Sequence, residues 1–167
     1  MHSDYFIVID KDKVDMSLLR TADSSLPRIM RYMNTAVPFV GLKGAVPICA
    51  CLVEHKEGYS DIVNFAVLSE YQGQGYGRAM LDYVKDYILS QGVRYLDIGC
   101  GNADIRLIVM LQKAGFRMIG VWPNYYTDDG AAADVINSII NRDMIRLRVD
   151  LMEKRLATIG YDASGRT

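Results

Sequence analysis

Hydrophobic and polar residues follow one another along the chain in a pattern that predicts an α+β fold. Short apolar runs rich in β-branched and aromatic residues predict strands at residues 5–9, 36–41, 45–53, 59–68, 93–99, 116–126 (interrupted near Pro123) and 143–151. Apolar residues at helical spacing predict helices at residues 14–22, 24–34, 78–91 and 102–114. The pattern therefore predicts about seven strands and about four helices.

Two prolines and a glycine restrict how the second and third strands fold. Pro38 and Pro47 cannot donate to a ladder, so they are expected near strand ends, at an edge or at a bulge. Gly44 is expected to take a positive φ in a hairpin turn between these two strands. The strand at residues 59–68 then completes an antiparallel meander.

The most informative stretch joins this last strand to the helix predicted at residues 78–91. Gly73, Gly75 and Gly77 occupy alternate positions, so the backbone can curl tightly and several N–H groups can point at one anion. The helix that follows adds the positive end of its dipole. The pattern predicts a pyrophosphate site, and a plain tight loop between strand and helix is the alternative.

Composition and charge favour one globular domain at residues 1–167 that acts on a small partner. The 19 basic and 20 acidic residues give a formal charge of −1, which argues against nucleic acid as the main partner. No run approaches the ~20 apolar residues of a membrane span, and the first residues carry no signal-peptide pattern. We therefore expect a cytoplasmic protein without a membrane partner.

The cysteines and histidines point to no disulfide framework and no metal. The chain has 3 cysteines, and an odd count argues against a disulfide framework, so Cys49 and Cys51 are expected to be small core residues. His2 and His55 have no carboxylate or cysteine at ligand spacing, so the sequence predicts no metal site.

Three segments resemble the GNAT N-acetyltransferases. Gln72-Gly73-Gln74-Gly75-Tyr76-Gly77 resembles the family signature Q/R-x-x-G-x-G/A, and the strand that precedes it, residues 61–67, is similar to the family's central strand. Residues 101–116 resemble the family's second signature. The resemblance implies a mixed, mostly antiparallel sheet flanked by helices, with acetyl-CoA as cosubstrate. It also implies acetyl transfer to a primary amine by direct attack in a ternary complex.

The resemblance assigns residues that bind the coenzyme. The backbone of residues 72–78 would hold the pyrophosphate, and the edge of residues 66–68 would pair with the pantetheine arm as if it were a strand. Val67 N–H would polarise the thioester carbonyl. Asn102 would touch the arm, or would simply cap the next helix. The predicted coenzyme-binding residues are Ala66, Val67, Leu68, Gln72, Gly73, Gln74, Gly75, Tyr76, Gly77, Arg78 and Asn102.

The resemblance also suggests two catalytic residues. Asp61 lies where many family members place a glutamate base. Because Asp61 precedes Val67 by six residues, both side chains are expected on one face of the strand. A solvated strand-end carboxylate is the alternative reading of Asp61. The family's usual tyrosine acid falls on Leu111 here, so another group must protonate the thiolate, or the thiolate leaves unaided. The candidate tyrosines are Tyr126, which we select, Tyr125 and Tyr71.

Two other functions stay open. Residues 96–101 look like the first glycine motif of S-adenosylmethionine-dependent methyltransferases, but only residues 102–167 follow, too few for that fold. An acyl-CoA-binding sensor or subunit without catalysis would fit the missing tyrosine. Residues 152–167 are expected to be a C-terminal extension that dangles or packs on the partner subunit of a homodimer. The sequence does not identify the acceptor, which is expected to be a small molecule.

Overall fold

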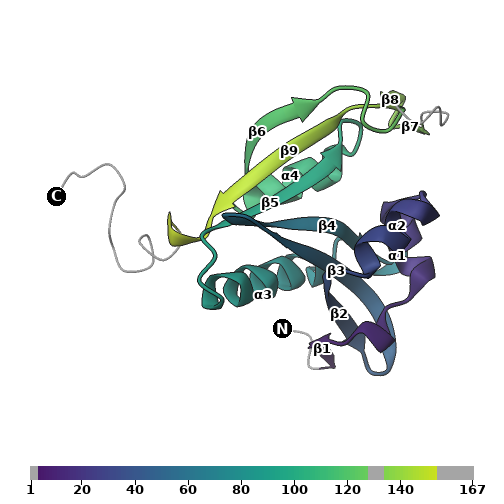
Figure 1. Ribbon diagram of the computed structural model, residues 1–167. Helices are drawn as coiled ribbons and strands as arrows, with labels where there is room; N and C mark the ends of the chain where they lie inside the picture. Colours follow the sequence, from purple (N-terminus) through teal and green to yellow (C-terminus); the bar gives the residue numbers. More distant parts are fainter. Residues whose placement is uncertain (1–3, 128–133, 154–167) are drawn as a thin grey trace. The chain divides into compact units, whose positions relative to one another are not determined.

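The computed structural model describes residues 4–127 and 134–153 (Figure 1). The chain divides between residues 93 and 94 into two compact units. Among the described residues, four main strands in the first unit and three in the second pair antiparallel within their units, and four α-helices accompany them. The predicted α+β class is therefore confirmed. The single domain expected at residues 1–167 stays a prediction, and most of the expected extension, from residue 154 onward, lies outside the described residues.

The first unit holds a four-stranded antiparallel sheet in the order β1-β2-β3-β4. Every strand and helix predicted in this part of the chain is present, with ends that differ by a few residues. Two short 3-10 turns, Lys11–Lys13 and Ser69–Tyr71, lie beside these elements. The elements are β1 (Tyr5–Ile9), α1 (Met16–Ala22), α2 (Leu26–Met33), β2 (Val37–Lys43), β3 (Val46–Lys56), β4 (Tyr59–Val67) and α3 (Tyr76–Ser90).

The hairpin between β2 and β3 has the predicted chemistry. Gly44 has a φ of 59° and lies in the turn, which the pair Lys43–Val46 closes. Pro38 and Pro47 are each the second residue of a strand, and the ladder shifts register beside Pro47. Both prolines therefore lie near strand ends, as predicted.

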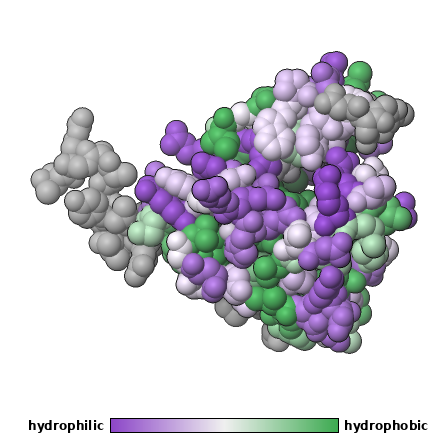
Figure 2. Space-filling view, viewed as in Figure 1, coloured by the Kyte–Doolittle hydropathy of each residue, from purple (hydrophilic) through white to green (hydrophobic). Residues whose placement is uncertain are grey.

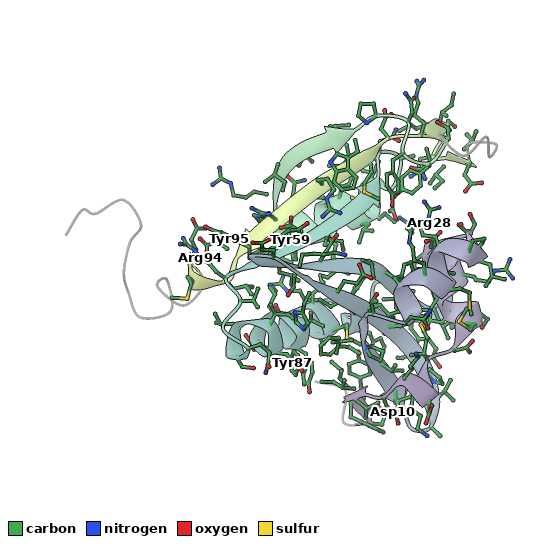
Figure 3. All side chains as sticks on the ribbon, viewed as in Figure 1. Asp10, Arg28, Tyr59, Tyr87, Arg94 and Tyr95 are labelled. Carbon is green, nitrogen blue, oxygen red and sulfur yellow. The ribbon has the colours of Figure 1, made fainter. Side chains whose placement is uncertain are left out.

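Helices cover both faces of this sheet. Leu52 and Ala66 belong to a buried cluster with residues of α1 and α2. On the other face, Phe39 of β2 packs edge-on against Tyr87, with ring centroids 5.1 Å apart. Figure 3 labels Tyr87 on α3. Phe39 pairs across the ladder with the fully buried Cys51, so the cysteines face α3. Cys49 and Cys51 are free, buried thiols, which confirms the core role predicted for them.

The second unit is built on three antiparallel strands, with β9 between β5 and β6. The last strand thus enters the middle of this group, and β6 forms its edge. The long strand predicted at residues 116–126 is shorter because Pro123 and the positive φ of Asn124, 57°, follow Trp122. The elements are β5 (Tyr95–Gly101), α4 (Ile105–Lys113), β6 (Arg117–Trp122), β7 (Asp134–Ile136), β8 (Ile139–Asn141) and β9 (Met144–Asp150).

The hairpin of β7 and β8 is an element that the sequence analysis missed. Asn137 and Ser138 have φ values of 54° and 62°, the left-handed pair that a two-residue hairpin turn requires. Val135-Ile136 and Ile139-Ile140 flank this turn and pair across it. Two short apolar runs separated by Asn-Ser were the available signal. The pattern predicted no strand between residues 126 and 143.

The visible surface mixes residue types. Hydrophilic and hydrophobic residues alternate over the face shown in Figure 2. In residues 4–127 and 134–153, no helix is long and apolar enough to cross a membrane. The same residues contain no group of three or more His, Cys, Asp or Glu side chains arranged to hold a metal ion.

Candidate functional site

The turn between β4 and α3 has the tight backbone that its glycines predicted. Gly73 and Gly75 have φ values of 72° and 92°, in the left-handed region where glycine is strongly favoured. A Cβ added at either position would meet no atom within 4 Å. These glycines are therefore required by backbone conformation and not by packing. The helix begins at Tyr76, two residues earlier than predicted, so Gly77 lies within its first turn.

The N-terminus of α3 differs from that of α1 and α4 because no side chain caps it. Its N-cap is Gly75, and its first turn holds no acidic residue. By contrast, Asp15 caps α1 and Asp104 caps α4, and each carboxylate accepts a backbone N–H of its helix. The partial positive charge of the α3 N-terminus therefore meets no carboxylate of its own cap or first turn. This geometry suits an anionic ligand.

Polar side chains of the turn brace the loop. Gln72 Nε2 donates to Val67 O at 3.0 Å, and Gln74 Nε2 donates to Glu70 O at 2.6 Å. Arg78 Nε lies 3.0 Å from Asp82 Oδ2, in an exposed pair one helical turn apart. Exposed pairs of this kind hold each other weakly.

Tyr76 fixes the turn to the core by packing its ring among other aromatic side chains. Its side chain is 1% exposed and contacts the rings of Tyr5 and Tyr71, at centroid distances of 4.9 and 5.8 Å. The ammonium of Lys43 lies 5.5 Å from the Tyr71 ring centroid and 5.9 Å from that of Tyr76. Tyr76 is thus a core residue, and its predicted contact with a ligand would be made by its backbone N–H.

The end of β4 directs backbone groups away from β3. Leu68 N donates to Ile48 O at 2.9 Å, so this residue's amide faces β3. Amide directions alternate along an antiparallel strand, so Val67 N–H points to the opposite edge of β4. That Val67 N–H contacts a ligand stays a prediction. On that edge, the side chain of Gln72 already donates a hydrogen bond to Val67 O.

The parity argument for Asp61 is wrong. The β3–β4 ladder shifts by one residue, because Leu52 pairs with Asn64 whereas Glu54 pairs with Asp61. A one-residue shift exchanges the faces of a strand. Asp61 therefore shares the α1–α2 face with Asn64, whereas Val67 pairs with Cys49 on the α3 face. The even spacing in the sequence could not reveal this bulge. The catalytic role of Asp61 stays a prediction.

A second carboxylate lies directly opposite Asp61. Glu54 accepts hydrogen bonds from Thr35 Oγ1 and from Lys56 Nζ, the latter at 2.6 Å. Burial raises the pKa of Glu54, but the hydrogen bonds from Lys56 and Thr35 outweigh it, so the pKa is lowered. The pKa of Lys56 is raised, mainly by its hydrogen bond to Glu54 and further by the charge of Asp61. Glu54 is therefore held ionised, and Asp61 lies in a charged neighbourhood.

Asn102 does not cap α4, contrary to the alternative drawn from the sequence. Its Oδ1 accepts N–H groups of Arg142 and Asp143 at 3.0 and 2.9 Å, and its Nδ2 donates to Ile140 O at 3.0 Å. Asp104 is the cap, with its Oδ1 accepting Leu107 N at 3.1 Å. The sequence favoured Asn102 because asparagine is a common cap. Asn102 instead fixes the connection between β8 and β9, and its coenzyme contact stays a prediction.

The residues considered for acid catalysis lie in different places. Leu111, at the family's tyrosine position, is fully buried in α4 and is a core residue. Tyr126 is half-buried in the second unit, its ring 5.1 Å from that of Tyr125, and its N–H donates to Arg142 O at 3.0 Å. Tyr71 lies in the turn before α3. The acid role selected for Tyr126 stays a prediction.

The second glycine-rich stretch precedes α4, and side chains of the protein itself occupy the space beside its glycines. A Cβ on Gly99 would lie 2.3 Å from Met144 Sδ, and one on Gly101 would lie 2.1 Å from Asn141 Oδ1. Both glycines thus allow close packing of neighbouring side chains. The turn that resembled a methyltransferase motif lacks the left-handed glycines and the uncapped helix found before α3.

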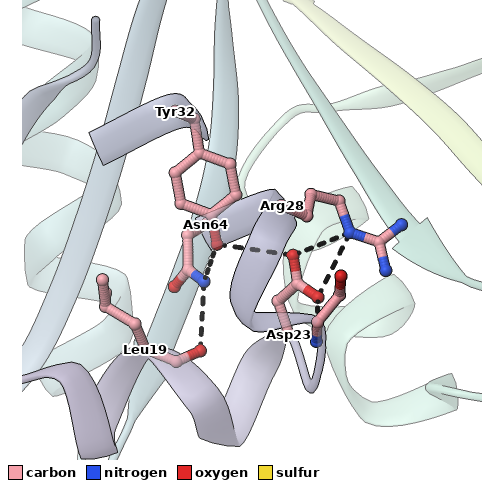
Figure 4. A network of polar contacts seen from close by, with 6 residues as sticks. Leu19, Asp23, Arg28, Tyr32 and Asn64 are labelled. Atoms are coloured by element: carbon pink, nitrogen blue, oxygen red, sulfur yellow. Dashed lines mark hydrogen bonds and ion pairs between the residues drawn. The ribbon is translucent and has the colours of Figure 1, made fainter. Parts of the chain in front are cut away.

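Sequence reasoning missed a buried polar network between β4 and the α1–α2 pair (Figure 4). Asn64 Nδ2 donates to Leu19 O at 3.1 Å and to Tyr32 Oη at 2.8 Å, and Asp23 extends the network to Arg28. An asparagine in the middle of the apolar run Ile62-Val63-Asn64-Phe65-Ala66 was the available signal. Its packing partners come from 32 and 45 residues away, so the sequence alone did not connect them.

Comparisons with known proteins agree with this geometry. Residues 20–116 match the acetyltransferase (GNAT) family. The uncharacterized N-acetyltransferase YvbK of Bacillus subtilis (strain 168) is 31% identical over 80% of this chain and 87% of that protein. The ribosomal protein bS18-alanine N-acetyltransferase of Escherichia coli (strain K12) is 28% identical over 65% of this chain and 72% of that protein. A GNAT family acetyltransferase from Elizabethkingia anophelis, solved with acetyl-CoA bound, has a TM-score of 0.83. It is 24% identical, and the match covers 89% of this chain and 99% of that chain.

Proposed function

The chain belongs to the acetyltransferase (GNAT) family, and from this premise we propose that it moves an acetyl group from acetyl-CoA to a primary amine. The transfer would occur by direct attack in a ternary complex. Both relatives carry the name N-acetyltransferase, and one acts on an alanine of a ribosomal protein, which supports an amine acceptor. The thioester of acetyl-CoA supplies an activated acetyl group, and the protein must hold it and deprotonate the amine.

The observation that carries the proposal is the uncapped N-terminus of α3. Backbone N–H groups of residues 73–78 would bind the pyrophosphate, with the helix dipole adding attraction. The N–H of Gln72, which the sequence prediction included, already donates to Ser69 O at 3.3 Å. Gly73 and Gly75 leave open space beside their backbone, as close approach of a phosphate requires. Arg78 would turn from Asp82 toward the phosphates. The match of these groups to a diphosphate supports acetyl-CoA as the cosubstrate.

The end of β4 would hold the reactive part of the coenzyme. Residues 66–68 would pair with the amide groups of the pantetheine arm as an added strand. Val67 N–H, directed away from β3, would donate to the thioester carbonyl and stabilise the charge that develops there. Asn102 is also proposed to contact the arm.

Proton transfer would use Asp61 and Tyr126. An amine with a pKa of about 10 arrives protonated at neutral pH, so a base must remove one proton before attack. Asp61 would do so directly or through water, beside the ionised Glu54. Tyr126 would return a proton to the departing thiolate. The sequence alternatives, a structural Asp61 or an unaided thiolate, are separable by substitution.

Steady-state turnover tests the proposal. Acetyl-CoA is mixed with a panel of primary amines that includes polyamines, aminoglycosides, amino acids and alanyl peptides, and released thiol is followed. We expect thiol release above the hydrolysis background with at least one amine, and acetylation of that amine by mass spectrometry. Binding of acetyl-CoA without turnover on the whole panel would instead favour a sensor or subunit. A cytoplasmic location and a homodimer stay predictions.

A further inference from the structure

Tyr71 and Tyr76 lie at the two ends of the glycine-rich turn before α3. Tyr71 directly precedes residues 72–75, and Tyr76 directly follows them. Their rings pack edge to face, with centroids 5.8 Å apart and an interplanar angle of 81°. The two ends of the turn are thus joined by a side-chain contact, in addition to the chain itself. Joining the ends of a loop reduces the number of conformations that its backbone can adopt.

The ammonium of Lys43 lies beside both rings. Its Nζ is 5.5 Å from the ring centroid of Tyr71 and 5.9 Å from that of Tyr76. Both distances fall within the ~6 Å range of cation–π attraction. Interaction with the side chain of Tyr76 raises the pKa of Lys43, so its ammonium stays charged at any pH near neutral. One cation at the end of β2 therefore attracts the residues at both ends of the turn.

Tyr5 connects this group of side chains to the sheet of the first unit. It pairs with Lys43 across the β1–β2 ladder, and its ring centroid lies 4.9 Å from that of Tyr76. A Cβ added to Gly41, on the same strand as Lys43, would lie 2.3 Å from Tyr5 Oη. The Tyr5 ring therefore lies against the backbone of Gly41. The rings next to the turn are thus held in place by two neighbouring strands.

The turn itself is built from residues that are costly to order. Gly73 and Gly75 have left-handed backbones, and glycine loses more conformational freedom on ordering than any other residue. The side-chain hydrogen bonds that Gln72 and Gln74 make to the backbone are exposed to solvent. A ligand that had to order this backbone would lose affinity by the cost of doing so. Contacts that order the turn before the ligand arrives remove that cost from the binding step.

We propose that Lys43 is a positioning residue for acetyl-CoA, which orders the phosphate-binding turn by holding the rings of Tyr71 and Tyr76 together. These three side chains are called the tyrosine clamp below. The inference rests on the proposed function and deepens it, because it names residues that act on the coenzyme through the backbone of the turn. Loss of either Lys43 or the Tyr71 ring should therefore weaken acetyl-CoA binding through the same cause, a less ordered turn.

Calorimetry with acetyl-CoA tests the proposal. Lys43→Met and Tyr71→Leu should each weaken binding by about three- to tenfold, and the double variant should lose less than the product of the two single losses. Lys43→Arg keeps the cation and Tyr71→Phe keeps the ring, so both should bind nearly as the parental protein does. Lys11→Met is the matched control, because it removes the same charge from the exposed 3-10 turn of the same unit. Its affinity should stay within about twofold of the parental value.

Nuclear magnetic resonance relaxation of the ligand-free protein measures the ordering directly. The backbone order parameters of Gly73 and Gly75 should fall in Lys43→Met and stay parental in Lys11→Met. The proposal is overturned if Lys43→Met binds acetyl-CoA as tightly as Lys11→Met does, if the double variant loses the full product, or if the order parameters do not change. A parental protein that does not bind acetyl-CoA would overturn the proposed function and with it the role of Lys43 in coenzyme binding. The order parameters would then still show whether the tyrosine clamp orders the turn.

Discussion

The chain passes from a strand through a glycine-rich turn into a helix twice, between β4 and α3 and between β5 and α4. In the first turn, Gly73 and Gly75 have left-handed backbones and open space around them, and no side chain caps the helix. Before the second turn, Gly99 and Gly101 at the end of β5 accommodate Met144 and Asn141 at close range. Asp104 caps the helix there.

This difference teaches that a glycine motif has two physical meanings. Glycine can permit a backbone conformation that exposes N–H groups, or it can permit neighbouring side chains to approach. The two turns look alike in the sequence, and each resembles a cofactor-binding signature. What separates them is the residue at the N-cap, because a carboxylate there uses the N–H groups that a phosphate would need.

The largest effect is expected from removing the carboxylate of Asp61, which tests whether a residue of β4 deprotonates the amine. Asp61→Asn keeps the shape of the side chain and removes the base, so turnover at neutral pH should fall about 10²- to 10⁴-fold. Acetyl-CoA affinity should stay unchanged, and raising the pH should recover part of the loss because more of the amine is then neutral. The measurement is kcat against pH with the best acceptor. Asp104→Asn, at the other turn, serves as the control and should keep parental turnover.

Parental turnover of Asp61→Asn between pH 6 and pH 9 would make this carboxylate structural. Deprotonation of the amine would then pass to Glu54, to another group or to bulk water.

A smaller effect is expected from filling the second turn. Gly101→Ala would place a Cβ 2.1 Å from Asn141 Oδ1 and within 2.8 Å of the rest of that amide, so the whole side chain must move. The free energy of unfolding should fall by about 1–3 kcal/mol. Gly120→Ala is the matched control, since a Cβ there meets nothing within 4 Å. Chemical denaturation of both variants gives the comparison, and equal stability would mean that Gly101 is not needed for packing.

The smallest effect concerns the cap of α4. Asp104→Ala removes the acceptor of Leu107 N and should lower the free energy of unfolding by about 1 kcal/mol. Asp104→Asn keeps a capping oxygen and should lose much less. Thermal unfolding monitored by circular dichroism measures both. A loss that is the same for Ala and Asn would show that charge, not capping, is what Asp104 contributes.

Most of the fold could be predicted from the sequence because local patterns determine it. Apolar periodicity located each long strand and helix, and Gly44, Gly73 and Gly75 marked positions of positive φ. The β7–β8 hairpin was missed because its strands are only three residues long, too short for a periodic signal. Its Asn-Ser turn was nevertheless readable.

The candidate site was predictable only where it is local. The turn before α3 is one continuous stretch, so its backbone could be anticipated. The face of Asp61 depends on a register shift against β3, and the network at Asn64 depends on Leu19 and Tyr32, which lie far away in the sequence. Likewise, Asp104 and not Asn102 caps α4, because the side chain of Asn102 makes hydrogen bonds with the backbone of the distant residues 140–143. Tertiary partners decided these features.

The central claim is that the N-terminus of α3 is open to bind the diphosphate of acetyl-CoA, and calorimetry on a variant of its first turn tests it directly. Gly77 is buried in the first turn, and Gly77→Asp adds a carboxylate there that repels phosphate, so circular dichroism first checks that both variants fold. Like charges about 4 Å apart repel by about 4 kcal/mol at an effective dielectric of 20, so affinity should fall on the order of a hundredfold or more. Gly77→Asn, of equal size and without charge, is the control and should lose far less. Acetyl-CoA affinity that is the same in Gly77→Asp and Gly77→Asn would contradict the claim.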